Sequence, residues 1–152
     1  MKKVRIVIGI GIVIAACLGV WWLMTRSDTV SIMRDKAYNI GFTPLWMDLP
    51  SGYSLAAKDV KTSNGILVAS VTAPNNARIV ITQQRASDAF STTRAEGKKF
   101  RTLYGQALVQ DFDDQTLGTL VSPDVVVLIN AKPPIGANEM EKLINSLKPL
   151  DK

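Results

Sequence analysis

The feature that most constrains this chain is an uncharged, proline-free apolar run at Ile6–Met24. A helix of that length, rising 1.5 Å per residue, is about 28 Å long and matches the hydrocarbon thickness of a bilayer. Trp21 and Trp22 lie at the far end of the run and Arg26 follows it, and these residue types favour the membrane interface. The run therefore predicts a transmembrane helix at residues 6–24, whose partner is the lipid bilayer.

Two other interpretations of the run stay open. Ile14, Ala15 and Ala16 followed by Cys17 form a lipobox-like pattern, which would make the chain a lipoprotein acylated at Cys17. The other alternative is a cleaved secretory signal, so it also stays open whether the segment is ever removed. Secretory signals have shorter apolar cores, of about 7–15 residues, and the residues after Cys17 remain apolar where lipoproteins usually have a polar tether. An uncleaved signal anchor is therefore the preferred interpretation.

Charge around the run predicts its orientation. Residues 1–5 hold three basic side chains and no acidic one, and basic residues in short flanking segments favour the cytoplasmic side. We therefore expect a cytoplasmic basic end at 1–5, a single pass through the cell membrane, and a C-terminal domain outside. The polar segment at 25–41 is interpreted as a juxtamembrane linker, and the extracytoplasmic domain is expected at 42–152.

Composition removes whole classes of chemistry. The chain has no histidine and a single cysteine, Cys17. Catalysis by serine–histidine or cysteine–histidine pairs, a thiolate zinc site and an intramolecular disulfide cannot be built from this set. We accordingly expect no catalytic residue, no metal site and no cofactor. The net charge is +5, but the basic N-terminal end supplies part of it and the other basic residues are scattered, so nucleic acid is not an expected partner.

The domain pattern predicts strands separated by turn signals. Asn64–Gly65 is the strongest hairpin signal, and Asn75–Asn76 marks a second hairpin because asparagine tolerates positive φ. The sequence VVVLINA, at residues 125–131, is nearly all apolar and is expected to be a central strand buried on both faces. The strands are expected at 53–60, 66–73, 78–84, 99–104, 106–112, 116–121 and 125–131.

The last predicted element is a helix. Gly136 or Asn138 is positioned to cap its start, and Pro149 is expected to end it. Its apolar stripe must be buried, and the sheet is the surface that can bury it. The expected fold class is therefore α+β, with an N-terminal transmembrane helix followed by an antiparallel sheet packed by a C-terminal helix. The stripe, at helical spacing, consists of Met140, Leu143, Ile144 and Leu147.

Three aromatic residues near the start of the domain form the candidate binding site. Phe42, Trp46 and Tyr53 are close in sequence and together can line an apolar pocket. The alternative is that they plug the domain core, as aromatic residues at the entrance of a domain often do. The structure decides between these interpretations by the exposure of their rings.

Two charged clusters are further candidate sites. The acidic cluster lacks the ligand spacing and the glycine of a calcium loop, so a solvated turn is expected; it consists of Asp111, Asp113 and Asp114. The densest basic patch is expected to be an ordinary polar surface, with contact to anionic lipid headgroups as the alternative; it consists of Arg94, Lys98, Lys99 and Arg101.

The segment from Leu49 to Leu147 also resembles a known group of domains. The segments that carry the resemblance, in order, are LPSGYSL, ARIVITQQ, KKFRTLYGQALV, GTLVSPDVVVLINA and NEMEKLINSLKPL. The chain resembles the small extracytoplasmic domains of uncharacterised bacterial single-span membrane proteins, and similar domains occur in anti-sigma-factor-type regulators. The aromatic residue usual in the penultimate hairpin is replaced by Leu120 and Val121. The resemblance implies fold and location, and it carries over no catalytic residue.

These observations lead to one expected function and two alternatives. We expect a membrane-anchored, non-catalytic extracytoplasmic domain that binds a protein or another envelope component. The first alternative is a carrier or sensor of an apolar small molecule or lipid, held in a crevice between the sheet and the C-terminal helix. The second is an enzyme that uses only carboxylates and lysines, which would require two acids converging in a cleft.

Overall fold

The computed structural model describes residues 29–37, 40–87 and 96–150. The predicted transmembrane helix at 6–24, its interface residues Trp21, Trp22 and Arg26, and Cys17 lie outside the described residues. Among the described residues, no helix is both long enough and apolar enough to cross a membrane.

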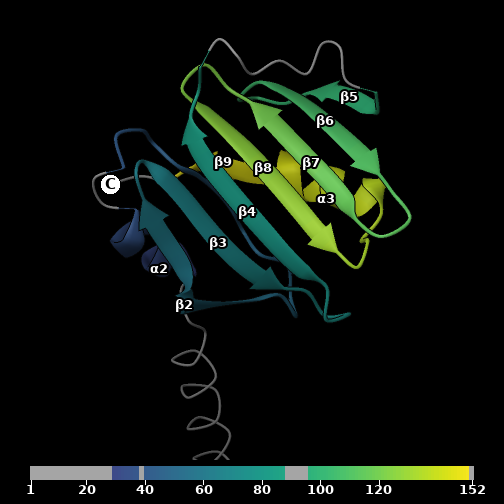
Figure 1. Cartoon of the computed structure of the whole chain (residues 1–152), viewed down its shortest axis with the longest axis horizontal. Coiled ribbons are helices and arrows are strands. Elements are labelled where there is room, and N and C mark those ends of the chain that lie inside the picture. Colours follow the sequence, from purple (N-terminus) through teal and green to yellow (C-terminus); the bar gives the residue numbers. More distant parts are fainter. Residues whose placement is uncertain (1–28, 38–39, 88–95, 151–152) are drawn as a thin grey trace, which may run out of the picture.

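One antiparallel sheet of seven strands forms the body of the domain (Figure 1). Two meanders build it, one from the first three strands and one from the last four, and they join where β4 pairs with β8. The sheet order is β2-β3-β4-β8-β7-β6-β5. The strands are β2 (Ser54–Ser63), β3 (Ile66–Thr72), β4 (Arg78–Arg85), β5 (Lys98–Arg101), β6 (Gln106–Asp111), β7 (Thr116–Val121) and β8 (Val125–Lys132).

The hairpins expected from asparagine and glycine are confirmed. Asn64 and Gly65 have φ angles of 51° and 72°, which is the left-handed pair that a tight hairpin between β2 and β3 requires. Asn76, with φ of 60°, turns the chain from β3 into β4. Both turns use residues that enter this region of φ at low cost, so local chemistry fixes the register of three strands.

One expected strand is shorter than the sequence suggested. β5 ends at Arg101 and does not reach Tyr104, because the hydroxyl of Thr102 accepts hydrogen bonds from the backbone N–H groups of Tyr104 and Gly105, each at 3.1 Å. These bonds close a tight turn that leads directly into β6. The tip residue, Leu103, is 95% exposed.

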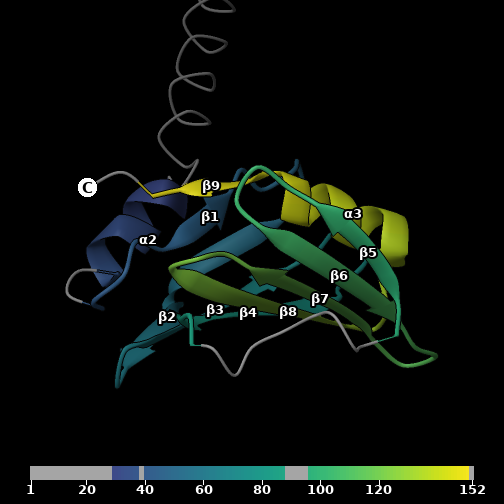
Figure 2. The same cartoon turned by 90° about the horizontal axis from the view of Figure 1, so that it is seen from above.

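The expectation that residues 125–131 are buried on both faces is wrong for the second half of the strand. β8 is central in the sheet, and Val125, Val126 and Val127 are all buried. Further along, Leu128 is 38% exposed and Asn130 is exposed. Among the described elements, α3 (Ala137–Asn145) and a small second sheet cover one side of the large sheet (Figure 2).

Helix α3 packs on β6 and β7 through the predicted stripe. Met140, Leu143 and Ile144 are buried, so the α+β class with an antiparallel sheet and a C-terminal helix is confirmed. The helix ends at Asn145, and the expectation that it continues to Pro149 is wrong. Leu147–Pro149 instead forms strand β9, which pairs with β1 (Leu45–Met47) in a separate two-stranded sheet. Leu147 keeps its predicted burial within that strand.

The segment expected to be a linker contributes to the core. Helix α2 (Thr29–Lys36) lies within residues 25–41, and its Met33 is completely buried against the rest of the domain. Val30 and Ile32 also pack against the core, and the helix lies beside β2. The packed unit therefore includes α2, and a boundary at residue 42 would remove part of its core.

Candidate functional site

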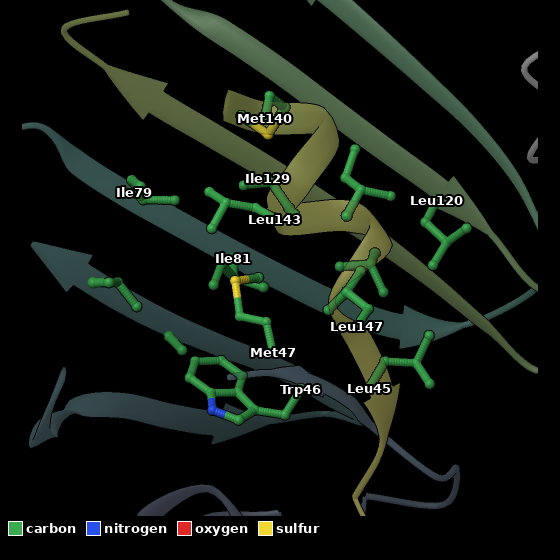
Figure 3. Close-up of a cluster of buried hydrophobic side chains, with 14 of the residues drawn as sticks. Leu45, Trp46, Met47, Ile79, Ile81, Leu120, Ile129, Met140, Leu143 and Leu147 are labelled. Atoms are coloured by element: carbon green, nitrogen blue, oxygen red, sulfur yellow. The ribbon is translucent and has the colours of Figure 1, made fainter. Parts of the chain in front are cut away.

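The three candidate aromatic residues do not form an exposed site. Trp46, in β1, is 1% exposed and lies in the same buried cluster as Met47 and Ile81 (Figure 3). Phe42 and Tyr53 are half-buried and pack against that cluster. The indole Nε1 of Trp46 has no hydrogen-bond partner among the described residues. The indole therefore contributes its apolar surface to the core, and a ligand would reach it only by displacing core side chains.

Tyr53 connects the start of β2 to the C-terminal helix. Its hydroxyl donates a hydrogen bond of 3.2 Å to Oε1 of Glu139 in α3, and Oε2 of Glu139 pairs with Nζ of Lys142 at 3.4 Å. Burial raises the pKa of Tyr53 above its ordinary value, and the negative charge of Glu139 and the hydrogen bond to it raise it further. Tyr53 thus stays protonated at neutral pH, and its hydrogen bond to Glu139 links the start of β2 to α3.

Only two polar residues in the described parts of the chain are buried, and both satisfy backbone or loop groups. The amide of Gln83, in β4, accepts a hydrogen bond from the backbone N–H of Leu45 at 2.8 Å and donates one to its carbonyl oxygen at 2.6 Å. This pair of bonds satisfies the edge of β1 that faces away from β9. The side chain of Gln83 therefore forms the two hydrogen bonds that a neighbouring strand would form, and it joins the small sheet to the large one.

Thr116, at the start of β7, is the second buried polar residue. Its hydroxyl donates to Oδ1 of Asp111 at 2.6 Å and accepts the backbone N–H of Gly136 at 3.2 Å. Gly136 is the N-cap of α3, and no side chain caps the helix. The hydroxyl of Thr116 thus positions the loop before α3 and the turn after β6, which is a structural role.

The acidic cluster lies on the turn between β6 and β7. Asp111, Asp113 and Asp114 are all exposed, in agreement with the expected solvated turn. Asp114 pairs with Lys132 at 2.8 Å, and the hydrogen bond and positive charge of that lysine lower the pKa of Asp114. No group of three or more acid, histidine or cysteine side chains among the described residues is arranged to hold a metal ion.

The basic patch is divided by the alternation of β5. Arg94 lies outside the described residues. Lys98 turns toward the helix side of the sheet, where it forms an ion pair with Glu141 of α3. Lys99 and Arg101 occupy the alternate positions of the strand and belong to the opposite face. The predicted patch is therefore two groups of charges on two sides of the sheet.

The opposite face of the seven-stranded sheet, which we call the outer face, was not foreseen from the sequence. Its residues come from strands far apart in the chain, and only the register brings them together. One row of cross-strand partners runs across all seven strands: Lys61, Val68, Thr82, Leu128, Thr119, Leu108 and Lys99. The row has a cation at each end and apolar or hydroxyl side chains between them.

No protein-family model matches this chain, and no curated protein matches it significantly. The sequence resemblance to small extracytoplasmic domains therefore stays a prediction. The residues themselves, and the surfaces on which the fold places them, carry what can be proposed about function. Among those surfaces, the outer face gathers side chains from all seven strands of the large sheet.

Proposed function

We propose that this chain is a single-pass membrane protein whose extracytoplasmic domain binds another macromolecule of the cell envelope and catalyses no reaction. The anchor is the apolar run at 6–24, with Trp21, Trp22 and Arg26 at its outer interface. The basic end at 1–5 is cytoplasmic. The alternatives of acylation at Cys17 and of signal cleavage are outcomes of the test below.

The observation that carries the proposal is the position of α2. The helix begins at Thr29, a few residues after the apolar run, and buries Met33 in the domain core. Each residue extends a chain by at most about 3.6 Å, so the domain cannot move more than about 20 Å from the end of the anchor. A domain held so close to a bilayer has a restricted set of surfaces that a partner can approach.

The packing of the domain supports binding over catalysis. Its buried polar side chains, Gln83 and Thr116, hold structural elements together, and the acids of the β6–β7 turn are exposed, with Asp111 bonded to Thr116 and Asp114 to Lys132. The interface between α3 and the sheet is tight where Gly118 meets the helix, because a Cβ atom there would lie 2.6 Å from Sδ of Met140. This contact speaks against an apolar ligand in that part of the sheet–helix interface.

The proposal is tested by topology and by mass. Full-length protein carrying alkaline phosphatase after Lys152 should be active in a bacterial host, while the same chain carrying green fluorescent protein there should be dark. Intact mass should match the unprocessed chain. The matched variant Cys17→Ser should leave both results unchanged, and Leu18→Arg, which puts a charge in the middle of the run, should release the chain from the membrane.

Three results would contradict the proposal. An acylated N-terminal Cys17, or a chain shortened near residue 24, would replace the anchor by a lipoprotein or a cleaved signal. Phosphatase inactivity together with fluorescence would place the domain in the cytoplasm. Hydrolysis or group transfer by the purified chain that Tyr53→Phe or a change in the β6–β7 acids abolishes would make it an enzyme.

A further inference from the structure

The charged side chains at the register-paired positions of the outer face are of one sign. Every strand position on this face that has a register partner is either uncharged or basic, and no carboxylate occurs among these paired positions. The basic side chains are all exposed, and they stand on β2, β4, β5 and β8. They are Lys61, Arg78, Lys99, Arg101 and Lys132.

On the helix side of the sheet, three lysines form ion pairs. Lys98, Lys142 and Lys148 each pair with a carboxylate, namely Glu141, Glu139 and Asp48. On the outer face Lys132 also forms such a pair, with Asp114 at the rim.

Three outer-face cations lack such a partner among the residues that the structure describes. Lys61, Arg78 and Arg101 form no ion pair with a carboxylate of the described residues. Nε of Arg78 donates instead to the hydroxyl of Ser70 at 2.8 Å, which lays the guanidinium along the face. The positive charges of these three residues are thus not offset by an ion pair within the described part of the chain.

Between these cations the face offers apolar and hydroxyl side chains. Leu128 lies near its middle and is 38% exposed, which is high for a leucine in a central strand. Thr82 and Thr119 are its cross-strand partners and are half-buried, as is Val80 on the next row. Val126 and Leu108 are buried on the same face, so its open apolar part lies around Leu128. A weakly apolar centre within a polar rim is the usual anatomy of a protein interface.

We propose that the outer face docks an acidic surface of a partner protein, with Leu128 at the centre of the contact and Lys61, Arg78 and Arg101 as the charges that recognise it. This rests on the proposed function, because it names the partner of the binding domain. Opposite charge steers the encounter and fixes the orientation, while burial of the apolar centre contributes to affinity.

Three other occupants fit the face less well. A second copy would bring two basic rims together, which is repulsive. Single-stranded nucleic acid requires aromatic side chains on which bases stack, and no aromatic residue occurs among the paired outer-face positions. The bilayer is disfavoured because α2, where the chain enters the domain, lies on the helix side of the sheet (Figure 2).

The experiment uses the full chain in nanodiscs of neutral phosphatidylcholine and a fluorescent poly-L-glutamate as the acidic probe. The test variant carries Lys61→Gln, Arg78→Gln and Arg101→Gln. The matched control carries Lys36→Gln, Lys142→Gln and Lys148→Gln, which removes the same charge from exposed positions on the helix side. Circular dichroism melting should show both variants folded.

We expect the test variant to bind poly-L-glutamate at least tenfold more weakly than the natural chain, and the control to stay within threefold. Leu128→Ser keeps every charge and tests the apolar centre of the contact with a folded partner protein. In that variant, cross-linking from a photoreactive residue at Thr119 to an acidic-surfaced envelope protein should fall at least threefold. Equal losses in the two triple variants, or no binding by the natural chain, would overturn the proposal.

Three parallel measurements separate the other occupants. Flotation with phosphatidylglycerol vesicles, binding of an oligothymidylate, and sedimentation of the chain are each repeated with the test variant. If the test variant loses vesicle binding, oligothymidylate binding or self-association by a larger factor than it loses poly-L-glutamate binding, the face belongs to lipid, nucleic acid or a second copy. That result would overturn the proposal. A cytoplasmic location in the topology experiment would refute the proposed function while leaving the poly-L-glutamate result intact.

Discussion

The side chain of Gln83 forms two hydrogen bonds with the backbone of Leu45, one as acceptor and one as donor, in the interior of the domain. The two residues belong to different sheets, so this contact joins the large sheet to the small one. The N–H and the carbonyl of Leu45 both point away from its cross-strand partner Pro149 in β9, so both depend on one glutamine.

Replacement of Gln83 should test that dependence. Gln83→Leu leaves the N–H and the carbonyl of Leu45 buried without partners, and each such group costs about 1–3 kcal/mol. We expect the free energy of unfolding to fall by about 2–4 kcal/mol in urea titrations of the full chain in detergent, followed by circular dichroism. Gln84→Leu, one residue along on the outer face, is the control and should change it by less than about 0.5 kcal/mol. Equal effects would show that the pairing with Leu45 is unimportant.

Gly118 should be intolerant of larger residues because α3 lies directly on it. A Cβ atom there would meet Sδ of Met140 at 2.6 Å and Cδ1 of Ile144 at 2.9 Å. Gly118→Val should cost about 1–3 kcal/mol by overpacking, and Gly118→Ala less, because the end of the Met140 side chain can shift. Thermal melting measures both.

The pair Gly118→Ala and Met140→Ala provides the control for this contact. The truncation of Met140 opens the space that a new Cβ needs, so the double variant should be more stable than the sum of the single effects implies. Strict additivity would mean that helix and sheet do not meet at this point. Thr119→Ala, on the outer face, should melt close to the natural chain.

We expect Thr116 to stabilise the domain through the hydrogen bonds of its hydroxyl and not through its volume. Thr116→Val keeps the volume but leaves Gly136 without its acceptor and Asp111 without its donor. We expect a loss of about 1–3 kcal/mol, with Thr116→Ser losing less because it retains the hydroxyl. Hydrogen exchange should show faster exchange at the first turn of α3 in the valine variant only. Equal losses in both variants would assign the effect to packing.

The raised pKa of Tyr53 makes part of the stability depend on pH. Because the folded chain binds the phenol proton more tightly than the unfolded chain, the contribution of Tyr53 is complete below about pH 10. It is lost as the pH rises from that value through the raised pKa. Ultraviolet titration of tyrosinate in the natural chain and in Tyr53→Phe should isolate one phenol that titrates above its ordinary range.

The variant Glu139→Gln separates the causes of that shift. It removes the negative charge beside Tyr53 but leaves the burial, which is the largest cause. The pKa of Tyr53 should therefore fall toward its ordinary value without reaching it. An unchanged titration would show that the contact between Tyr53 and Glu139 does not persist in solution.

The sequence predicted the parts of the fold that depend on local chemistry. Asn64–Gly65 and Asn76 determine hairpins by the φ values they permit, and the spacing of Met140, Leu143 and Ile144 predicts a buried helix face whatever it packs on. These signals are contained within a few residues. They gave the α+β class and most of the strands without knowledge of the sheet order.

The remaining parts depend on contacts between distant residues. β1 and β9 have three residues each, too few for a periodic pattern, and they exist because Gln83 and the pairing of Leu45 with Pro149 hold them. The sequence of helix α2 is typical of a polar linker, because Met33 is the only fully buried residue of the helix and one residue forms no apolar pattern. The outer face required the register of all seven strands, which places Lys61 and Lys99 at the two ends of one row.

The pairing of β1 with β9 also determines when the domain can finish folding during its biosynthesis. The partner of Leu45 is made about a hundred residues later, which is roughly 5–20 s at ordinary rates of translation. Until then the nascent chain lacks the strand that closes its core. The proposed export of the domain through a narrow translocation channel would benefit from such a delay.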